Sequence, residues 1–286
     1  MKEEIPMQTL GYYNGTINDL EHSTVPMLDR GCYYGDGVFN VSYSRNRRIY
    51  EYNAHMDELY RSAAGVGITP PISREDLEKL LYRLIEKMDD NDLRLYVQFT
   101  RGTGIRQFSF SEGAGKSNLM IMITPGGLQD IHKTLRCITG EDRRHLLCNF
   151  KTLNYIANVL TMRDVDDAKV DDCIVHRGNM VTEFVHANLA VLENGTVITP
   201  PANQYIYAGV GLKLMLKECE KNGIPYEERP IMLDELFTAD EVFRVSGSSL
   251  CMRVVEIDGK PIGGKDEKNL TILQNSLLEK FLSETE

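Results

Sequence analysis

The sequence predicts an α+β protein made of two domains. Its 286 residues exceed the size of one minimal domain, and helix-like segments are interspersed with strand-like ones. A Pro-Gly-Gly break at residues 125–127 follows an apolar, strand-like run and is the clearest punctuation in the chain. We therefore expect a small α/β domain over residues 1–124, a linker over 125–130 and a larger, strand-rich α+β domain over 131–286.

The first half contains one well-marked helix and two strands. Residues 73–88 begin with Ser73, a residue type that caps helix N-termini, and repeat apolar residues with helical spacing. The apolar face of this helix consists of Leu77, Leu80, Leu81, Leu84 and Ile85. Residues 94–100 and 118–124 are short apolar runs rich in strand-forming residues, which indicates two strands.

The second half predicts two helices and four strands. Thr152 is a suitable N-cap for a helix, and Gly223 marks the end of another. Asn194-Gly195 is a strong hairpin signal between two apolar runs. The apolar positions of the first helix are Leu153, Ile156 and Leu160. The other expected elements are strands at 172–176, 180–183, 187–192 and 196–199 and a helix at 211–222.

Composition argues against several classes of function. Lys plus Arg number 32 against 42 Asp plus Glu, so the formal net charge is -10. Nucleic acids and anionic membranes are bound through clustered cations, which this balance disfavours. The six cysteines lack a CxxC pair, so they predict neither a zinc site nor a disulfide framework. No stretch has the length and apolarity of a membrane span or a signal-peptide core, and we expect a cytoplasmic protein.

Three segments contain residues suited to catalysis or binding. Lys151 lies where a helix is expected to begin, and a partly desolvated lysine beside the positive end of a helix dipole suits imine formation, although a surface lysine is the commoner finding. Glu183 ends a predicted strand and is either a solvated edge residue or a partner for a pyridine nitrogen. Arg101 and Arg106 follow a strand on a glycine-containing loop, which suits either carboxylate binding or a plain solvated loop.

Taken together and in this order, the segments resemble the class IV (fold-type IV) aminotransferases. That family uses pyridoxal 5′-phosphate (PLP) and includes D-amino-acid and branched-chain aminotransferases and aminodeoxychorismate lyase. The resemblance extends over nearly the whole chain. It rests on the motifs around Lys151 and Glu183 and on residues 29–39, 55–63, 233–243 and 257–262. It implies the family's two-domain fold, with the active site in the cleft between the domains, and a homodimer.

The resemblance also implies roles for individual residues. Lys151 would form a Schiff base with PLP and then move a proton between the substrate Cα and the cofactor. Glu183 would pair with the pyridine nitrogen, and Asn188 would have a structural role. Arg106 would bind the substrate α-carboxylate, as its counterpart does in D-amino-acid aminotransferases. The implied reaction transfers an amino group between an amino acid, of the D- or branched-chain type, and a 2-oxo acid, without a metal.

The sequence departs from the family pattern where the cofactor phosphate binds. Glu58 stands where the family has a phosphate-binding arginine, and its charge repels a phosphate dianion. Arg61, three residues later on the same helical face, or Arg253 would supply the missing positive charge. Gly211 stands where the family has a threonine at a helix N-terminus. The other phosphate-binding residues that the resemblance implies are Val210, Ser246, Gly247 and Ser248.

The expected substrate pocket also departs from that of D-amino-acid enzymes. Phe39 lacks the phenol that those enzymes have beside the carboxylate, and Phe108 replaces a histidine expected two residues after Arg106. These three are the predicted substrate-binding residues, and the choice between D- and L-substrates stays open. Two other functions also stay open: a lyase similar to aminodeoxychorismate lyase, and a family member with altered cofactor binding that acts as a non-catalytic binding protein. The retained Lys151 and Glu183 favour the aminotransferase.

Overall fold

The computed structural model describes residues 7–109 and 115–286 and divides the chain into two compact units. Unit 1 comprises residues 1–127, 150–154 and 284–286, and unit 2 comprises residues 128–149 and 155–283. The mixture of helices and sheets confirms the predicted α+β class. The prediction placed residues 150–154 in the domain 131–286, but they belong to unit 1 because they pair with one of its strands.

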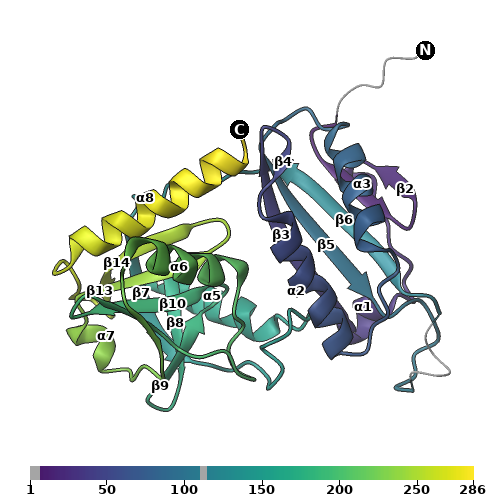
Figure 1. Cartoon of the computed structure of the whole chain (residues 1–286). Helices are drawn as coiled ribbons and strands as arrows, with labels where there is room; N and C mark the ends of the chain where they lie inside the picture. Colours follow the sequence, from purple (N-terminus) through teal and green to yellow (C-terminus); the bar gives the residue numbers. More distant parts are fainter. Residues whose placement is uncertain (1–6, 110–114) are drawn as a thin grey trace. The chain divides into compact units, whose positions relative to one another are not determined.

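Unit 1 is built on an antiparallel sheet. Its strands are β1 (Leu10–Tyr13), β2 (Thr16–Asn18), β3 (Gly37–Arg45), β4 (Arg48–Ile49), β5 (Leu93–Thr100) and β6 (Asn118–Pro125). Within the described residues they run in the order β2-β1-β6-β5-β3-β4. The helices are η1 (Leu20–His22, 3-10), α1 (Arg30–Tyr34), α2 (Tyr52–Gly65) and α3 (Arg74–Ile85). Figure 1 shows α2 and α3 lying along the sheet.

The predicted elements of the first half are confirmed. The Ser73 side chain caps α3 by accepting a hydrogen bond from the Asp76 N–H, and the predicted apolar face of this helix is buried. In β5 the buried residues alternate, as expected for a strand with one face on the core. The core of unit 1 joins these two faces and includes Leu77, Leu81, Leu84, Leu95, Val97 and Phe99. Each such buried side chain contributes about 1.5–3 kcal/mol through the hydrophobic effect.

Unit 2 is built on a larger mixed sheet. Its strands are β7 (Leu135–Glu141), β8 (Asp172–Arg177), β9 (Met180–Phe184), β10 (Asn188–Glu193), β11 (Thr196–Thr199), β12 (Tyr226–Glu228), β13 (Glu241–Ser246), β14 (Leu250–Ile257) and β15 (Lys260–Pro261). They run in the order β12-β11-β10-β13-β14-β7-β8-β9, and β15 pairs with β14. The β11–β12, β14–β7 and β7–β8 pairs are parallel. The helices are α5 (Ile156–Ala168), α6 (Val210–Asn222), α7 (Glu235–Thr238) and α8 (Glu267–Glu284).

Most of the second-half predictions are confirmed, and one is wrong. Strands β8 to β11 match the expected ranges, and Asn194 and Gly195 take the left-handed backbone conformation of a hairpin turn, with φ angles of 51° and 76°. Helix α6 ends at Gly223, which has a φ of 67°. The helix expected from Thr152 begins only at Ile156. The segment before it pairs with β3 instead of turning into a helix.

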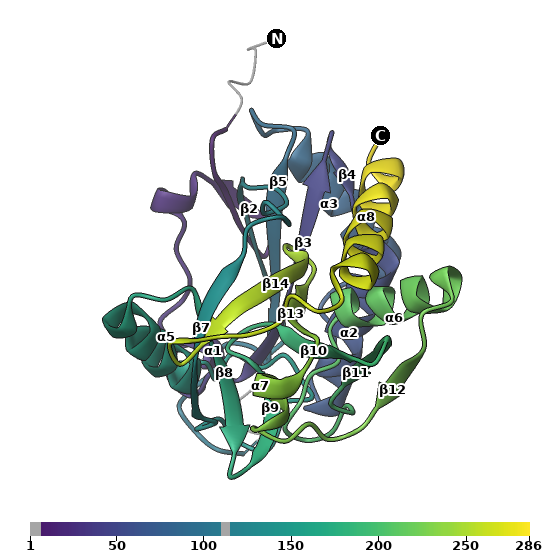
Figure 2. The same ribbon diagram turned by 90° about the vertical axis from the view of Figure 1, so that its left-hand side faces the viewer.

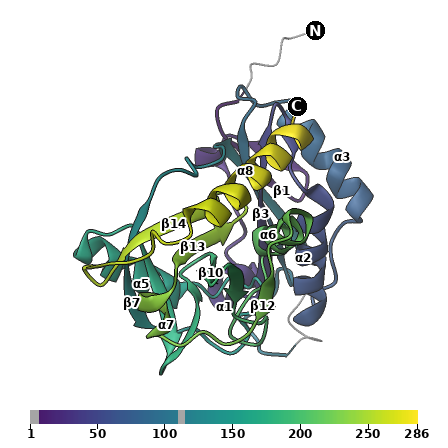
Figure 3. The ribbon, with the colours of Figure 1, turned by 60° about the vertical axis from the view of Figure 1, so that its left-hand side comes forward.

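The helices of unit 2 contact different strands of its sheet. Helix α5 contacts β7 and β8, whereas α6 contacts β13 and β14. Figure 2 separates these two helices, with the strands of the sheet between them. Helix α8, yellow in Figure 3, is anchored by the Gln274 side chain, which donates hydrogen bonds to the Ile131 and Cys251 carbonyl groups at 3.0 and 2.9 Å. Over residues 7–109 and 115–286, no helix has both the length and the apolarity that crossing a membrane requires.

Candidate active site

Lys151 lies on a short extended segment of unit 1. The Lys151 carbonyl accepts a hydrogen bond from the Phe39 N–H at 2.9 Å, and the Leu153 N–H donates to the Gly37 carbonyl at 3.1 Å. Thr152 forms an antiparallel bridge with Val38. The expectation that Lys151 sits at the start of a helix is therefore wrong, because pairing with β3 takes precedence over the local capping signal of Thr152. Lys151 is positioned by a sheet.

The surroundings of Lys151 come from β3 and α2. Its Nζ lies 4.7 Å from the centre of the Phe39 ring, and its backbone N–H donates to the Ser62 hydroxyl at 3.2 Å. His55 is buried, and its Nδ1 is 2.8 Å from Asn40 Oδ1. Burial, reinforced by the charge of Lys151, lowers the pKa of His55 to about 4, so this imidazole is neutral at physiological pH. Two residues of α2, His55 and Ser62, thus present neutral side chains near the lysine segment.

Glu58 and Arg61 form an ion pair on α2. Arg61 Nη2 and Nε lie 2.6 and 3.0 Å from Glu58 Oε2, as the spacing of three residues on one helical face predicts. The Glu58 side chain is only 3% exposed, whereas that of Arg61 is 44% exposed. The Arg61 guanidinium lies 5.5 Å from the centre of the Phe150 ring, next to Lys151 in the chain. A positive charge therefore lies close to the Lys151 segment, within the same unit.

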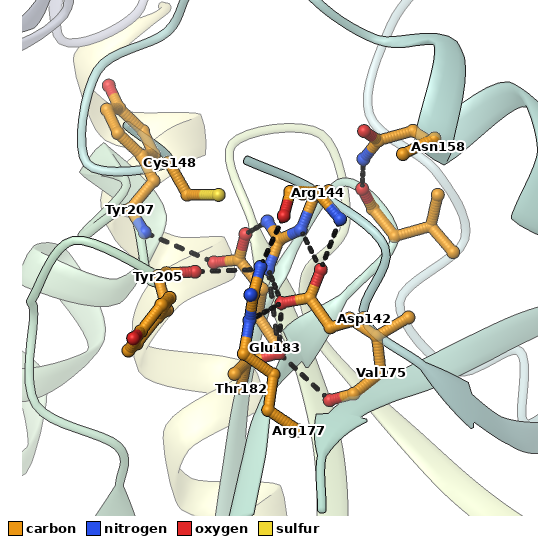
Figure 4. A network of polar contacts seen from close by, with 12 residues as sticks. Asp142, Arg144, Cys148, Asn158, Val175, Arg177, Thr182, Glu183, Tyr205 and Tyr207 are labelled. Atoms are coloured by element: carbon orange, nitrogen blue, oxygen red, sulfur yellow. Dashed lines mark hydrogen bonds and ion pairs between the residues drawn. The ribbon is translucent and has the colours of Figure 1, made fainter. Parts of the chain in front are cut away.

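Glu183 lies on β9 in the middle of a buried polar network (Figure 4). Its Oε1 pairs with Nη1 of Arg144, a residue of the loop after β7. Its Oε2 accepts longer hydrogen bonds, from the Tyr207 N–H at 3.3 Å and from Asn188 Nδ2 at 3.5 Å. Burial raises the pKa of Glu183 to about 7, while the charge of Arg144 acts in the opposite direction. Glu183 is therefore no solvated edge residue, because it is buried and paired.

Asn188 has the structural role that was implied for it. Its Nδ2 donates to the Tyr207 carbonyl at 2.5 Å, and its Oδ1 accepts from the Gly209 N–H at 3.0 Å. These bonds fasten the chain leading into α6 to strand β10. The Glu183 carboxylate and the start of α6 are thus positioned by the same amide.

The predicted phosphate-binding residues of unit 2 lie together. A Cβ on Gly211 would lie 2.6 Å from the carbonyl carbon of Ser246 and 2.8 Å from its oxygen, so glycine allows this close approach of α6 to the turn after β13. Ser246 Oγ lies 2.7 Å from Ser249 Oγ and 3.3 Å from Ser248 Oγ. Gly247 belongs to the same turn, and Val210 is the first residue of α6. Helix N–H groups and serine hydroxyl groups, which both bind anions, therefore meet here.

Arg253 does not belong to this group. Its Nε lies 3.0 Å from Glu241 Oε2, and its Nη1 lies 3.0 Å from Glu267 Oε1. This guanidinium is neutralised by two carboxylates of its own unit. Of the two arginines considered for the missing charge, Arg61 is the better candidate.

The predicted substrate-binding residues fall into two sets within unit 1. Phe39 stacks on Tyr96 with ring centres 5.0 Å apart and also contacts Lys151. Arg106 is exposed and lies 5.1 Å from the centre of the Tyr34 ring. Phe108 is 81% exposed and packs against the same tyrosine. Phe39 is therefore beside the lysine, whereas Arg106 and Phe108 gather around Tyr34.

Several residues of the site were not predicted from the sequence. Arg144 and its partner Asp142 were missed, as was Tyr155, whose pKa is raised by burial and by the nearby charge of Glu183. An aspartate followed by two arginines shortly before Lys151 was the available signal. In the described part of the chain, no group of three or more His, Cys, Asp or Glu side chains is arranged to hold a metal ion.

The residues present fit PLP by their chemistry. The cofactor has an aldehyde, a pyridine nitrogen and a phosphate. Lys151 offers a primary amine, and Glu183 offers a buried carboxylate whose Oε2 accepts long hydrogen bonds. The start of α6 at Gly211 offers N–H donors to an anion, and the serine turn beside it offers O–H donors. The negative charge of Glu58 would repel the phosphate, and its ion pair with Arg61 offsets much of this repulsion.

Comparison with known proteins gives a consistent family. Residues 37–257 match the family described as amino-transferase class IV. The chain is 33% identical over 274 residues to a D-alanine aminotransferase from Bacillus licheniformis, which covers 93% of this chain and 96% of that protein. Its fold is similar to that of a branched-chain aminotransferase from Thermoproteus uzoniensis with norvaline, with a TM-score of 0.83, 22% identity and 95% of each chain covered. It is also similar to a T.th. branched-chain amino acid aminotransferase with pyridoxamine 5′-phosphate, with a TM-score of 0.87, 19% identity and 98% and 96% of the two chains covered.

Proposed function

Since the chain belongs to the class IV aminotransferases, enzymes that use PLP, we propose that Lys151 is the residue to which the cofactor is joined. When bound, PLP withdraws electrons from the substrate Cα, which makes the Cα proton acidic. Lys151 Nζ is the group that we propose takes this proton and returns it at the cofactor. The observation that carries the proposal is the position of Lys151, held by β3 and by Ser62 beside a neutral His55.

We propose that Glu183 binds the pyridine nitrogen of PLP. We also propose that the phosphate is bound by residues of unit 2 and by Arg61. Glu183 Oε2 is available for a stronger hydrogen bond than the two long ones that it accepts. The phosphate-binding residues are Val210, Gly211, Ser246, Gly247, Ser248 and Arg61. Because Glu58 neutralises part of the charge of Arg61, we expect this phosphate site to bind less strongly than one with an unpaired arginine.

We propose D-amino acids as amino donors and 2-oxo acids as acceptors. The relatives with 33% and 32% identity are named D-alanine aminotransferases, whereas the branched-chain enzymes have 22% identity or less and support the fold alone. Arg106 suits the substrate carboxylate, because its guanidinium is exposed on a loop and offers paired N–H donors. Phe39 and Phe108 supply apolar contacts where polar side chains were expected, which favours substrates with apolar side chains.

Reduction of the PLP-loaded protein with borohydride tests the assignment of Lys151. This treatment fixes the cofactor on the lysine that holds it, and mass spectrometry of proteolytic fragments then locates it. We expect the label on Lys151 and none after Lys151→Ala. The matched control is Lys217→Ala, which removes an exposed lysine of α6 and should leave the labelling unchanged. A label spread over several lysines, or its survival in Lys151→Ala, would contradict the assignment.

We further propose that the chain forms a homodimer in the cytoplasm. Each unit exposes large apolar side chains that a partner subunit would cover: Met27, Leu28, Ile105 and Phe108 in unit 1, and Leu146, Leu147, Ile156 and Val159 in unit 2. All six cysteines are free thiols, which suits a reducing compartment. Sedimentation equilibrium checks the assembly: a mass of one chain, 32.5 kDa, at micromolar concentration would contradict the dimer.

A further inference from the structure

Arg144 of unit 2 has hydrogen-bonded partners on several sides of its guanidinium. Its Nε and Nη2 donate to Asp142 Oδ1 and Oδ2, both at 2.8 Å, in the bidentate arrangement typical of arginine and carboxylate. Its Nη2 also donates to the Tyr205 carbonyl at 3.1 Å, and its Nη1 donates to Glu183 Oε1. Its side chain is 11% exposed. The guanidinium is therefore locked in one orientation by partners on three sides, as Figure 4 shows.

The charges of this network balance so that Arg144 can stabilise the negative charge of Glu183. The Asp142 side chain is fully buried, and its Oδ2 also accepts from Arg177 Nε at 3.1 Å and from the Thr182 hydroxyl at 3.1 Å. Two arginines thus face two carboxylates. Because Arg177 compensates Asp142 from the other side, the positive charge of Arg144 is available to favour the ionised form of Glu183.

We propose that Arg144 is a positioning residue that favours the ionised form of Glu183 and turns its Oε2 toward the pyridine nitrogen of PLP. This inference rests on the proposed pairing of Glu183 with that nitrogen. Arg144 pairs with Oε1, and among the described residues Oε2 accepts only the long hydrogen bonds from Tyr207 and Asn188. An ionised Glu183 stabilises a protonated pyridine ring, which is the state that withdraws electrons best.

The pKa of Glu183 supports this role. Burial raises that pKa, and the charge and hydrogen bond of Arg144 are the largest effects that lower it, so that the resulting pKa is about 7. Without Arg144, mainly the Tyr207 N–H would oppose burial, so the pKa of Glu183 would rise further and the protonated form would predominate at neutral pH. A protonated carboxyl group does not stabilise a positive charge on the pyridine ring. Loss of Arg144 should therefore resemble loss of the Glu183 charge.

Binding of PLP and of 1-deazapyridoxal 5′-phosphate, in which carbon replaces the pyridine nitrogen, tests the proposal without measuring turnover. Equilibrium affinities are measured for the wild-type protein, Arg144→Gln, Glu183→Gln and the double variant. The wild-type protein should prefer PLP, and Arg144→Gln should lose roughly tenfold or more of this preference, because an uncompensated buried carboxylate becomes neutral. Arg143→Gln is the matched control, since the neighbouring Arg143 is 42% exposed and pairs with Asp164 at the surface.

The outcomes separate this inference from the proposed function. A wild-type protein without preference for PLP over the deaza analogue would contradict the role of Glu183 and the inference with it. A wild-type preference that persists in Arg144→Gln would overturn the role of Arg144 alone. If Arg144→Gln does not fold, the double variant decides, because removal of the Glu183 charge relieves the unpaired carboxylate. Its preference should then equal that of Glu183→Gln, and any further loss would contradict the proposal.

Discussion

Gly211 provides a sharp test of how the start of α6 packs against the serine turn. A Cβ at this position would meet the carbonyl carbon, the oxygen and the Cα of Ser246 at 2.6, 2.8 and 2.9 Å. All three atoms belong to the backbone, so no side-chain rotation relieves the contact. Gly211→Ala should therefore push α6 away from the turn.

The size of the effect follows from two opposing contributions. Alanine favours a helix over glycine by up to about 1 kcal/mol. Overpacking of a tight contact costs about 1–3 kcal/mol. We expect the clash to win and Gly211→Ala to lower the free energy of unfolding by about 1–2 kcal/mol. Threonine, which the family has at this position, should cost at least as much and should not tighten binding of PLP.

Urea unfolding followed by circular dichroism measures this change in the cofactor-free protein. Lys217→Ala on the exposed face of α6 is the control, because it gains no clash and keeps a strong helix former. A Gly211→Ala variant more stable than the wild-type protein would show that α6 does not approach Ser246 this closely. Such a result would remove the structural basis of the proposed phosphate site.

Three further predictions concern α2 and α3. Arg61→Ala should weaken the binding of PLP roughly tenfold and leave the binding of unphosphorylated pyridoxal unchanged, because Arg61 is assigned to the phosphate. The control is Arg48→Ala, which removes an exposed arginine of β4. An equal loss of affinity for both ligands in Arg61→Ala would contradict the assignment. His55, whose pKa falls from 6.5 to about 4 on folding, should make the protein less stable as pH drops from 6.5 to 4, by about 3 kcal/mol in total. Urea unfolding at pH 7 and pH 4.5 should show a smaller loss for His55→Gln, and an identical loss would refute burial of a neutral imidazole. Ser73→Ala should cost about 1 kcal/mol through loss of the α3 cap, measured by thermal unfolding, whereas no change would mean that the cap is not formed.

Local signals predicted the regular elements well. The Ser73 cap, the leucine spacing that follows it and the Asn194-Gly195 turn each act within a few residues, and each appears where it was expected. Thr152 failed as a helix signal for a physical reason. Its segment finds a partner in β3, which lies far away in the chain, and hydrogen bonding to that strand overrides a local capping preference.

The site residues show the same division. Lys151 and Glu183 could be named from short motifs, and helical spacing placed Glu58 and Arg61 on one face, where the structure pairs them. The Asp-Arg-Arg run before Lys151 does not show which arginine matters, because the role of Arg144 arises only when the sheet brings it to Glu183. The family resemblance implies only a general structural role for Asn188, and the hydrogen bond that its Oδ1 accepts from the Gly209 N–H specifies that role. Residues that are brought into contact by pairing between distant strands show no local pattern that a single sequence would reveal.

The central claim is that this chain transfers amino groups from D-amino acids through PLP held on Lys151. A half-reaction with one substrate tests it most directly: the PLP-loaded protein is mixed with D-alanine or L-alanine, without an oxo acid, while the visible absorbance of the cofactor is followed. We predict that D-alanine removes this absorbance and releases one pyruvate per cofactor, that L-alanine does so far more slowly, and that Lys151→Ala does neither. Faster conversion by L-alanine, or no conversion by either enantiomer, would contradict the claim.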